Sequence, residues 1–473
     1  MGSEKAVLQV KPVEALIVVV LLIAWISTTM IALEVIPHVS IITAIFGLLA
    51  YGIFKKVSIK DLEAGMVKGA QSGLGAIFIF FFIGMMISSW IASGTIPTFI
   101  YVALNAFSGQ YFYAIVFVAT SLVGLFIGSS LTTAATVGVI FISVASAFDM
   151  SLAITAGAIV SGAFFGDKLS PLSDTTNLAS MVVGVDLFDH IKNMLWTTVP
   201  AYILSFIIFM FLSPGSNLQS IAKMDELKSV LVEMSLVHWY SAIPLVILVI
   251  LALKKVTAIV TLSVSTLSAL IIAPFVQADF PLNSLLSLLY SGYVSETGNA
   301  EIDALLTRGG IESMMFSISL VLLALAMGGL LFKLGIVPAL LEGVKKHLVK
   351  PGVLITSTAL TAIGVNLTIG EQYLSVLLPG NTYAPFYEKA NLHLKNLSRT
   401  LEDAGTVVNP LVPWSVCGIF LTGVLGVPTI EYAPFAFFCL FSPILTIFFG
   451  LTGLTITKLE TTVQANPGIS RER

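Results

Sequence analysis

Two carboxylates and a lysine interrupt a long apolar stretch of this chain. Between Lys68 and Asp167 the only charged residue is Asp149, and the apolar run then meets the segment GDKLSPLSDTTN at residues 166–177. A charge at the centre of a bilayer costs about 2.5 to 3.5 kcal/mol on insertion scales, so such residues usually face a water-filled cavity on an ion or substrate path. This segment is therefore the first candidate functional site.

The side chains of this segment suit a sodium ion. Sodium is a hard cation that prefers oxygen ligands, and a helix break adds freed backbone carbonyl groups. Carboxylate, hydroxyl and amide oxygens are supplied by Asp167, Ser173, Asp174, Thr175, Thr176 and Asn177. Burial disfavours the charged form of a carboxylate that lacks a cation, so such a group can exchange a proton for sodium. We expect Asp174 to be the shared site, Asp167 the second ligand or proton acceptor, and Lys168 their charge partner.

Two further stretches, near 112–147 and 351–388, carry polar residues where a continuous span would be apolar. The polar centres read GSSLTT at 128–133 and GEQY at 370–373. Non-helical backbone at membrane depth is tolerated only where it is buried in protein or lines a cavity. We therefore predict two re-entrant hairpins whose tips reach the site. They add Ser129, Ser130, Thr132, Thr133 and Glu371 to the candidate ligands.

The composition places the chain in a lipid bilayer. Apolar residues make up 57% of the chain and charged residues 10%, with a mean hydropathy of +0.99, whereas soluble domains are about 25% charged. We expect an all-α polytopic membrane protein with no nucleic-acid partner. Cys417 and Cys439 are expected to be packed thiols, and the five histidines lack the spacing of metal ligands.

Ten spans are expected, because a run of about 20 apolar residues can cross a hydrocarbon core of roughly 30 Å. The first is expected to be a retained helix rather than a cleaved signal peptide, and two of the ten, at 154–184 and 397–427, are expected to be broken. The ten lie near 13–33, 37–54, 74–92, 154–184, 195–212, 238–253, 256–276, 314–332, 397–427 and 433–455.

Short matches recur in order along the two halves of the chain. Residues 69–72 match 310–313 and residues 94–97 match 335–338 at an offset of 241, residues 128–129 match 370–371 at 242, and residues 172–174 match 401–403 at 229. Four matches in order predict two structural repeats of roughly 120 residues. The predicted division is 1–60 for N-terminal helices, 61–212 for the first repeat, 213–300 for connecting loops and two helices, 301–455 for the second repeat and 456–473 for a cytoplasmic tail.

The placement of lysines predicts that the repeats are inverted. Lys55, Lys56 and Lys60 precede the first repeat, whereas Glu296 and Glu301 precede the second. Because cytoplasmic loops carry an excess of lysine and arginine, these equivalent segments are expected on opposite sides of the membrane. Inverted repeats with interrupted helices are typical of secondary transporters, whose sites lie near the midplane at the repeat interface.

The sequence GAFFGDKLSPLSDTTNLA at 162–179 resembles the signature of the NhaC-type sodium/proton antiporters. The segments EDAGT at 402–406 and NPLVPW at 409–414 resemble the second-half motif of that family, and the resemblance spans most of the chain. It implies membership of the ion-transporter superfamily, in which hairpin tips and broken helices meet to hold substrate and sodium. Partners of the first-half carboxylates are then expected at Asp403, Thr406 and Asn409, together with Glu371.

The resemblance implies a secondary active transporter in the plasma membrane of a prokaryote. By alternating access it would exchange cytoplasmic sodium for external protons, with these transported ions and no further cofactor. The sequence leaves open a homodimer. It also leaves open a sodium-coupled exchanger of a small organic acid or amino acid, for example of the malate/lactate type, because a hydroxyl-rich hairpin tip and half-helix N-termini could bind a carboxylate. The absence of an arginine near the site argues against a dicarboxylate.

An enzyme is not expected, because Gly-x-Ser-x-Gly and paired-histidine motifs are absent near the site. A passive channel is not expected either, because titratable carboxylates fit coupled exchange better.

Each candidate residue also has a structural alternative. An Asp167–Lys168 pair could fix the helix break, and Ser173 to Thr176 could cap the following half-helix. The residues at 128–133 could serve close helix packing, Glu371 a salt bridge at the rim, and His190 an interfacial face.

Overall fold

The regular secondary structure in the described part of the chain is helical. The computed structural model describes residues 6–106, 111–147, 149–213, 228–254, 256–277, 281–296, 303, 306–344 and 350–459. Within these ranges the only strand-like pairing is two isolated bridges, Tyr293–Arg308 and Leu392–Lys458. The predicted all-α class is thereby confirmed. Glu301 and the part of the predicted tail at 460–473 lie outside the described residues.

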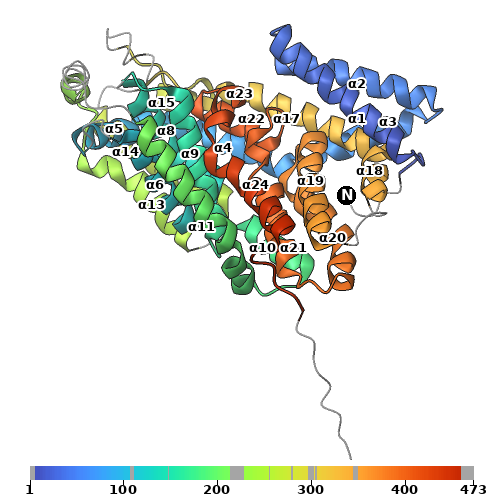
Figure 1. Cartoon of the computed structure of the whole chain (residues 1–473). Helices are drawn as coiled ribbons and strands as arrows, with labels where there is room; N and C mark the ends of the chain where they lie inside the picture. Colours follow the sequence, from blue (N-terminus) through green and yellow to red (C-terminus); the bar gives the residue numbers. More distant parts are fainter. Residues whose placement is uncertain are drawn as a thin grey trace, which may run out of the picture.

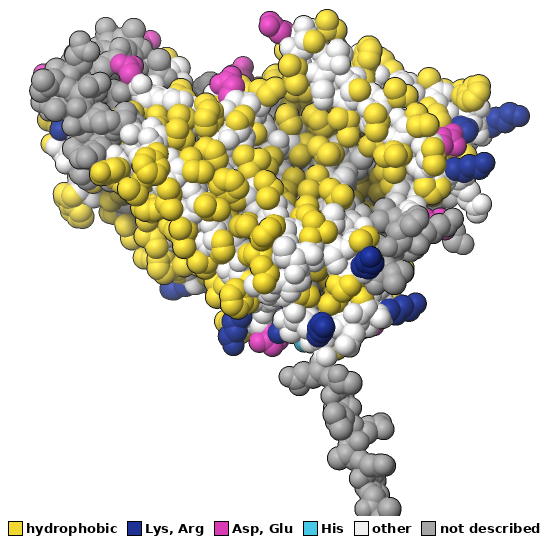
Figure 2. Space-filling view, in the orientation of Figure 1, with side chains coloured by type: hydrophobic (Ala, Val, Ile, Leu, Met, Phe, Trp, Pro, Cys, Tyr) yellow, Lys and Arg dark blue, Asp and Glu magenta, His cyan; other side chains and the backbone are white. Residues whose placement is uncertain are grey.

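Eight helices of the described part are long and apolar enough to cross a membrane. They are α1 (Pro12–Ser27), which continues as the π-helix η1 (Thr28–Ala32), α2 (Pro37–Phe54), α4 (Leu74–Ala92), α9 (Leu152–Leu169), α11 (Leu187–Leu212), α14 (Ala258–Val276), α17 (Gly310–Lys333) and α19 (Pro351–Ile369). Hydrophobic side chains cover most of the face shown in Figure 2, and charged side chains lie along its margins. The number becomes ten if two bent pairs of helices each form one span.

The bent pairs lie in the last third of the chain. One runs from α21 (Lys395–Leu401) through the π-helix η5 (Glu402–Thr406) and the 3₁₀ turn η6 (Asn409–Leu411) to α22 (Val416–Leu425), with a bend of 46°. The other joins α23 (Thr429–Tyr432) and η7 (Ala433–Phe435) to α24 (Phe437–Thr452), with a bend of 59°. The first bend confirms the predicted break within 397–427. The predicted break within 154–184 is the gap between α9 and α10 (Asp174–Val183).

The shorter helices complete the architecture (Figure 1). They are α3 (Ile59–Gln71), α5 (Thr95–Ala106), α6 (Phe112–Ile127), α7 (Ser130–Thr133), η2 (Ala134–Gly138), α8 (Val139–Ala147), η3 (Trp239–Ala242), α13 (Ile243–Leu253), α15 (Leu282–Ser291), α18 (Ile336–Val344) and α20 (Gln372–Lys389). The sequence did not predict α3, α5 and α18. It also placed the start of α11 too late, because the side chain of Asp186 accepts hydrogen bonds from the backbone N–H groups of Phe188 and Asp189 and begins the helix there.

Each predicted hairpin is a pair of helical legs that reverses at a glycine. The legs of the first are α6 and the run α7–η2–α8, and those of the second are α19 and α20. Gly128 and Gly370 stand at the two reversals with φ of +69° and +74°, a left-handed conformation that glycine adopts without steric cost. The polar centres seen in the sequence are therefore the tips of the two hairpins.

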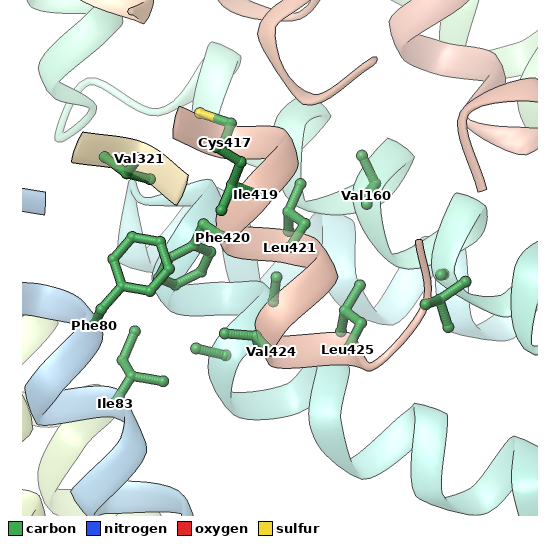
Figure 3. Close-up of a cluster of buried hydrophobic side chains, with 14 of the residues drawn as sticks. Phe80, Ile83, Val160, Val321, Cys417, Ile419, Phe420, Leu421, Val424 and Leu425 are labelled. Atoms are coloured by element: carbon green, nitrogen blue, oxygen red, sulfur yellow. The ribbon is translucent and has the colours of Figure 1, made fainter. Parts of the chain in front are cut away.

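A hydrophobic core lies between the two halves of the chain. Figure 3 shows Phe420 of α22 beside Phe80 of α4, and their ring centroids are 4.9 Å apart in an edge-to-face arrangement. Val160 of α9 and Val321 of α17 belong to the same buried cluster. The second half-helix of the late broken span is thus packed against helices from early in the chain.

Backbone landmarks recur at a constant offset of 242 residues. The tip glycines Gly128 and Gly370 are one pair, and the left-handed glycines that end α10 and α22, Gly184 and Gly426, are another. The two halves therefore share an order of elements. The predicted match of residues 172–174 with 401–403 is wrong, because the first set begins α10 after its break whereas the second lies in α21 and η5 before theirs.

Candidate ion-binding site

Asp167 and Lys168 occupy the last turn of α9 inside the protein. Their exposed fractions are 5% and 0%. The helix reaches this depth because it packs closely on α6 along small residues, a common arrangement between membrane helices. A Cβ atom added to Gly124 of α6 would lie only 2.9 Å from the carbonyl oxygen of Ala163 in α9. The end of α9 thereby brings a carboxylate and an ammonium into the core.

The carboxylate of Asp167 lies between the first hairpin tip and the helix break. The side chains of Ser130, at the tip, and Ser173, in the break, both interact with it, and the backbone N–H of Ser130 does so as well. These contacts confirm that the predicted hairpin tip and broken helix meet. Hydroxyl and carboxylate oxygens here form a cluster of hard ligands.

Several predicted ligands mainly hold the break in shape. The Ser173 hydroxyl accepts a hydrogen bond from the backbone N–H of Thr176, and the Thr176 hydroxyl donates to the carbonyl oxygen of Lys168 at 3.0 Å. The amide of Asn177 donates to the carbonyl oxygens of Pro171 and Ser173. Thr176 and Asn177 therefore stabilise the backbone of the break, while Ser173 caps α10, the alternative that the sequence left open, and also contacts Asp167.

Asp174 lies on a different surface from Asp167. It is the first residue of α10 and is exposed, whereas Asp167 is buried. The rotation of α10 turns Thr175 and Thr176 inward and leaves Asp174 exposed; its role as the shared site stays a prediction. Of the two carboxylates, Asp167 is the one inside the protein.

Lys168 is paired with the other half of the chain and not with its neighbour Asp167. Its ammonium donates a hydrogen bond to Oδ1 of Asp403, and both side chains are fully buried. Its Nζ also lies 5.5 Å from the ring centroid of Phe438. Asp403 comes from the π-helix η5, a form that often marks functional sites within α-helices. Asp403 was expected as a partner of the first-half carboxylates, and the first-half group it contacts here is the ammonium of Lys168.

Glu402, the neighbour of Asp403, faces the break in the first half. Its Oε1 accepts a hydrogen bond from the Thr175 hydroxyl at 3.1 Å, and its side chain is fully buried. The hydroxyl of Thr406 lies beside the same carboxylate. In the described ranges, neither Glu402 nor Asp167 forms an ion pair. The sequence did not select Glu402, although its place beside Asp403 in the second-half motif was a signal.

The second hairpin tip meets the second break through amide groups. Nδ2 of Asn409 donates to Oδ1 of Asn366 at 2.8 Å and to the carbonyl oxygen of Gly370 at 3.3 Å. Oδ1 of Asn409 accepts from the backbone N–H of Cys417 at 3.0 Å. The amide of Gln372 donates to the carbonyl oxygen of Thr406 at 3.0 Å. Asn409 and Thr406, expected as partners of the first-half carboxylates, lie in the second break and contact the second hairpin tip. The other amides of this neutral cluster, Asn366 and Gln372, were missed by sequence reasoning.

The remaining tip residues act chiefly on their own helices. Glu371 caps α20 by accepting a hydrogen bond from the backbone N–H of Leu374 at 2.7 Å. The Ser129 hydroxyl caps α7 by accepting a hydrogen bond from the backbone N–H of Thr132. The Thr133 hydroxyl donates a hydrogen bond to the carbonyl oxygen of Ser129. The rim salt bridge considered for Glu371 would involve Lys345, Lys346 or Lys350. The first two lie outside the described residues, and the described part shows no ion pair between Glu371 and Lys350.

Tyr373 brings the second tip close to the carboxylates of the first half. Its phenol lies within electrostatic range of Asp167, Asp174 and Glu371. Glu371 lies on the same tip, and its carboxylate caps α20. The two hairpin tips therefore converge on one region.

Two further buried groups near the ion pair were not anticipated. Arg399, one helical turn before Asp403, is fully buried, and its Nη1 donates to Oγ1 of Thr455 at 3.2 Å. His190 is buried as well, not interfacial, and its Nδ1 is 2.8 Å from Oγ of Ser398. The inference that no arginine lies near the site is therefore wrong. The spacing of four residues between Arg399 and Asp403 could have revealed it.

Comparison with known proteins places the chain in a family. The model of the Na+/H+ antiporter family matches residues 3–176 and 162–454. The chain is 42% identical over 440 residues to the Na(+)/H(+) antiporter NhaC of Alkalihalophilus pseudofirmus, covering 92% of this chain and 95% of that protein. It is 38% identical to the Na(+)/H(+) antiporter NhaC of Bacillus subtilis, covering 88% and 93% of the two chains.

A relative named for a different exchange reaction is also similar. The malate-2H(+)/Na(+)-lactate antiporter of Bacillus subtilis is 33% identical over 444 residues, which cover 93% of this chain and 94% of that protein. The family model and the relatives at 38–42% identity agree with the resemblance of residues 162–179 and 402–414, and with the apolar helices. This multi-pass membrane protein belongs to the Na+/H+ antiporter family.

Proposed function

We propose that this chain exchanges cytoplasmic sodium for external protons across the plasma membrane of a prokaryote, with Asp167 as the group at which the two ions compete. The observation that carries the proposal is the arrangement of the two adjacent charges in α9. Lys168 is bound to Asp403, and Asp167 lies buried between Ser130 and Ser173 without an ion pair in the described ranges. The neighbouring ammonium is therefore already committed to another carboxylate.

A buried carboxylate without a cation is costly at membrane depth, so its charge must be neutralised. A sodium ion or a proton can each do so, but both cannot occupy the same oxygen atoms at once. Ser130 and Ser173 supply hydroxyl oxygens for the ion, and Glu402 with Thr175 lies on the other side of the break. Exchange follows when this region opens alternately to each side of the membrane.

The order of elements supports a proposed mechanism of alternating access. We take 61–212 and 301–455 as two inverted repeats, each with a hairpin tip that touches its own helix break. In the first repeat Ser130 contacts Asp167, and in the second the carbonyl oxygen of Gly370 accepts from Asn409. Movement of a tip relative to its break would open or close the route to Asp167. Asp174, exposed at the start of α10, is placed to attract a cation toward the buried carboxylate.

One observation favours the alternative substrate, a small organic acid exchanged with sodium. Arg399 is buried, and its Nε and Nη2 have no hydrogen-bond partner among the described residues. A guanidinium with free N–H groups is suited to a carboxylate. The similarity to the malate-2H(+)/Na(+)-lactate antiporter points the same way at lower identity.

The proposal can be tested with two matched variants in proteoliposomes. Internal pH is followed with a fluorescent dye after a sodium gradient is imposed, first with sodium alone and then with malate and lactate. Asp167→Asn should abolish sodium-driven proton movement, because an amide cannot exchange a proton for sodium. Asp174→Asn should keep the exchange with a higher KM for sodium, because an exposed charge near the entry route is lost.

The outcomes distinguish Asp167 from other candidate carboxylates and sodium/proton exchange from organic-acid exchange. Asn can accept a hydrogen bond through Oδ1 and donate one through Nδ2 to a serine hydroxyl, and an unchanged melting temperature would show that Asp167→Asn is folded. If Asp167→Asn then transports like the parent chain, the shared carboxylate lies elsewhere. If exchange requires malate or lactate, the organic-acid alternative replaces simple sodium/proton exchange.

A further inference from the structure

An apolar groove runs between the first two helices, away from the ion-binding site. Its volume is about 500 Å³. Among the side chains that line it are Val18, Leu22 and Trp25 of α1 and Ala44, Gly47 and Leu48 of α2. Nε1 of Trp25 donates to Oγ1 of Thr43 at 2.9 Å and ties the two helices together. In Figure 1 the two helices lie at one edge of the molecule, so the groove belongs to its periphery.

One end of the groove carries a cluster of charges. Tyr51, which lines the groove, donates a hydrogen bond to Oε1 of Glu14 at 3.0 Å. Nζ of Lys55 lies 2.5 Å from the same oxygen and 5.6 Å from the centroid of the Tyr51 ring. Lys11, which precedes α1, also lies within electrostatic range of Glu14. Two ammonium groups therefore flank a single carboxylate at this mouth.

The surplus of positive charge extends beyond the mouth. Lys56 and Lys60, which follow α2, are both exposed. Of the two carboxylates that follow, Asp61 is paired with Nζ of Lys333 at 3.4 Å, and the exposed Glu63 offsets one of the lysines. By the positive-inside rule, this lysine-rich end faces the cytoplasm. The mouth is thus basic on the side of the membrane where anionic lipid headgroups attract lysine and arginine.

We propose that the groove binds an anionic phospholipid, with one acyl chain between α1 and α2 and the phosphate at Lys55 and Lys11. The apolar walls match a hydrocarbon chain, whose burial there displaces no polar contact. The lysines match a headgroup with a net negative charge and give no advantage to a zwitterionic one. A second copy of this chain would have to present an acidic surface to the same mouth, and charge complementarity favours the lipid.

Gly47 offers a specific way to block the groove. A Cβ atom added there has no heavy atom within 4 Å, so a larger side chain would fill the groove without displacing the fold. Gly75, exposed on α4, has the same open surroundings and lies outside the groove. Gly47→Leu and Gly75→Leu are therefore a matched test and control.

The experiment is native mass spectrometry of the full chain after removal of endogenous lipid. Phosphatidylglycerol and phosphatidylcholine are titrated separately. The parent chain and Gly75→Leu should retain phosphatidylglycerol in preference to phosphatidylcholine, and Gly47→Leu should lose that preference. Lys55→Gln and Lys11→Gln should each weaken phosphatidylglycerol binding about fivefold, since a lysine near a membrane surface contributes about that factor.

Two results would overturn the proposal. Equal binding of the two lipids by the parent chain would show that the basic mouth does not select a headgroup. A dimer of the parent chain that Gly47→Leu converts to monomer, with lipid binding unchanged, would assign the groove to a second copy of the chain. Neither result depends on sodium transport, because no residue of the groove belongs to the ion-binding site.

Discussion

Asp167 and Asn409 occupy equivalent positions in the two halves of the chain. Each lies six residues before a serine that caps the half-helix after a break: Ser173 caps α10 and Ser415 caps α22. Each also contacts the hairpin tip of its own half. The two positions thus share a local geometry but differ in chemistry, because one side chain is an acid and the other an amide.

The amide at position 409 is fixed by its hydrogen bonds, so we predict that Asn409→Asp destabilises the protein. Its Nδ2 donates to two oxygen atoms, those of Asn366 and Gly370, and a carboxylate oxygen in the same place would face both acceptors. Loss of a satisfied buried hydrogen bond costs about 1 to 3 kcal/mol, and more for a charged group. The melting temperature of the purified variant should fall well below that of Asp167→Asn. Equal melting temperatures would contradict this account of Asn409.

Protons should compete with sodium. If one buried carboxylate binds both ions, the apparent KM for sodium should rise as pH falls, because protonation removes the binding form. At saturating sodium the transport rate should become insensitive to moderate acidification. Initial rates over a matrix of pH and sodium concentrations provide the measurement. A fall in maximal rate at unchanged KM would mean that protons act at a separate group.

The buried pair of Lys168 and Asp403 should be more sensitive to single than to double replacement. Removing one partner leaves an uncompensated charge in the core, which costs about 3 to 5 kcal/mol, whereas apolar replacement of both can be neutral. Lys168→Met and Asp403→Leu should each lower the melting temperature, and the double variant should recover most of the loss. Additive losses in the double variant would show that the two side chains are not coupled. Transport should stay impaired in all three if the pair also positions η5.

The tip glycines should tolerate alanine poorly. Gly128 and Gly370 have left-handed backbones, which cost an ordinary residue about 1 to 2 kcal/mol. At Gly370 the added Cβ would also lie 3.1 Å from the carbonyl oxygen of Trp414. Gly128→Ala and Gly370→Ala should reduce transport, whereas Gly364→Ala, in open surroundings on α19, should not. Transport rates normalised to the amount of folded protein would reveal the difference.

The proposed inversion of the repeats predicts the side of each hairpin. A cysteine at Tyr111, which is exposed just before α6, should react with an impermeant reagent from outside the cell. One at Lys350, exposed just before α19, should react from the cytoplasm. The equivalent test site Ser108 lies outside the described residues. Labelling of both positions from the same side would rule out inversion.

The features that sequence revealed well were those set by hydrophobicity. A span is an apolar run of sufficient length, and a polar centre within such a run marks a tip or a break, so the hairpins and the broken helices could be predicted. Short matches of residue type predicted the alignment of the two halves less well. The pairing of Ser173-Asp174 with Glu402-Asp403 followed residue types, whereas the true register is carried by backbone features such as Gly184 and Gly426.

Tertiary contacts decided what the sequence could not. Asp167 is buried at the end of α9, whereas the exposure of Asp174 depends on how α10 is rotated against its neighbours. No local sequence pattern gives that rotation angle. The adjacency of Asp167 and Lys168 suggested a pair, but successive residues on a helix point in different directions, so Lys168 reaches Asp403 instead. Arg399 is different, because its spacing of four residues from Asp403 is a local pattern that could have been used.

The pairing of Lys168 with Asp403 also bears on how the protein is made. The two residues are 235 positions apart, so at about 5 to 20 residues per second the ribosome completes Asp403 roughly 10 to 50 s after Lys168. Throughout that interval the ammonium at the end of α9 has no counterion from the second half. The nascent first half must keep this charge hydrated or at the lipid interface, and α9 can take its final depth only once the later helices have been inserted. The first half therefore completes its folding in the membrane only together with the second half. A truncated first half should remain accessible to the translocation and quality-control machinery.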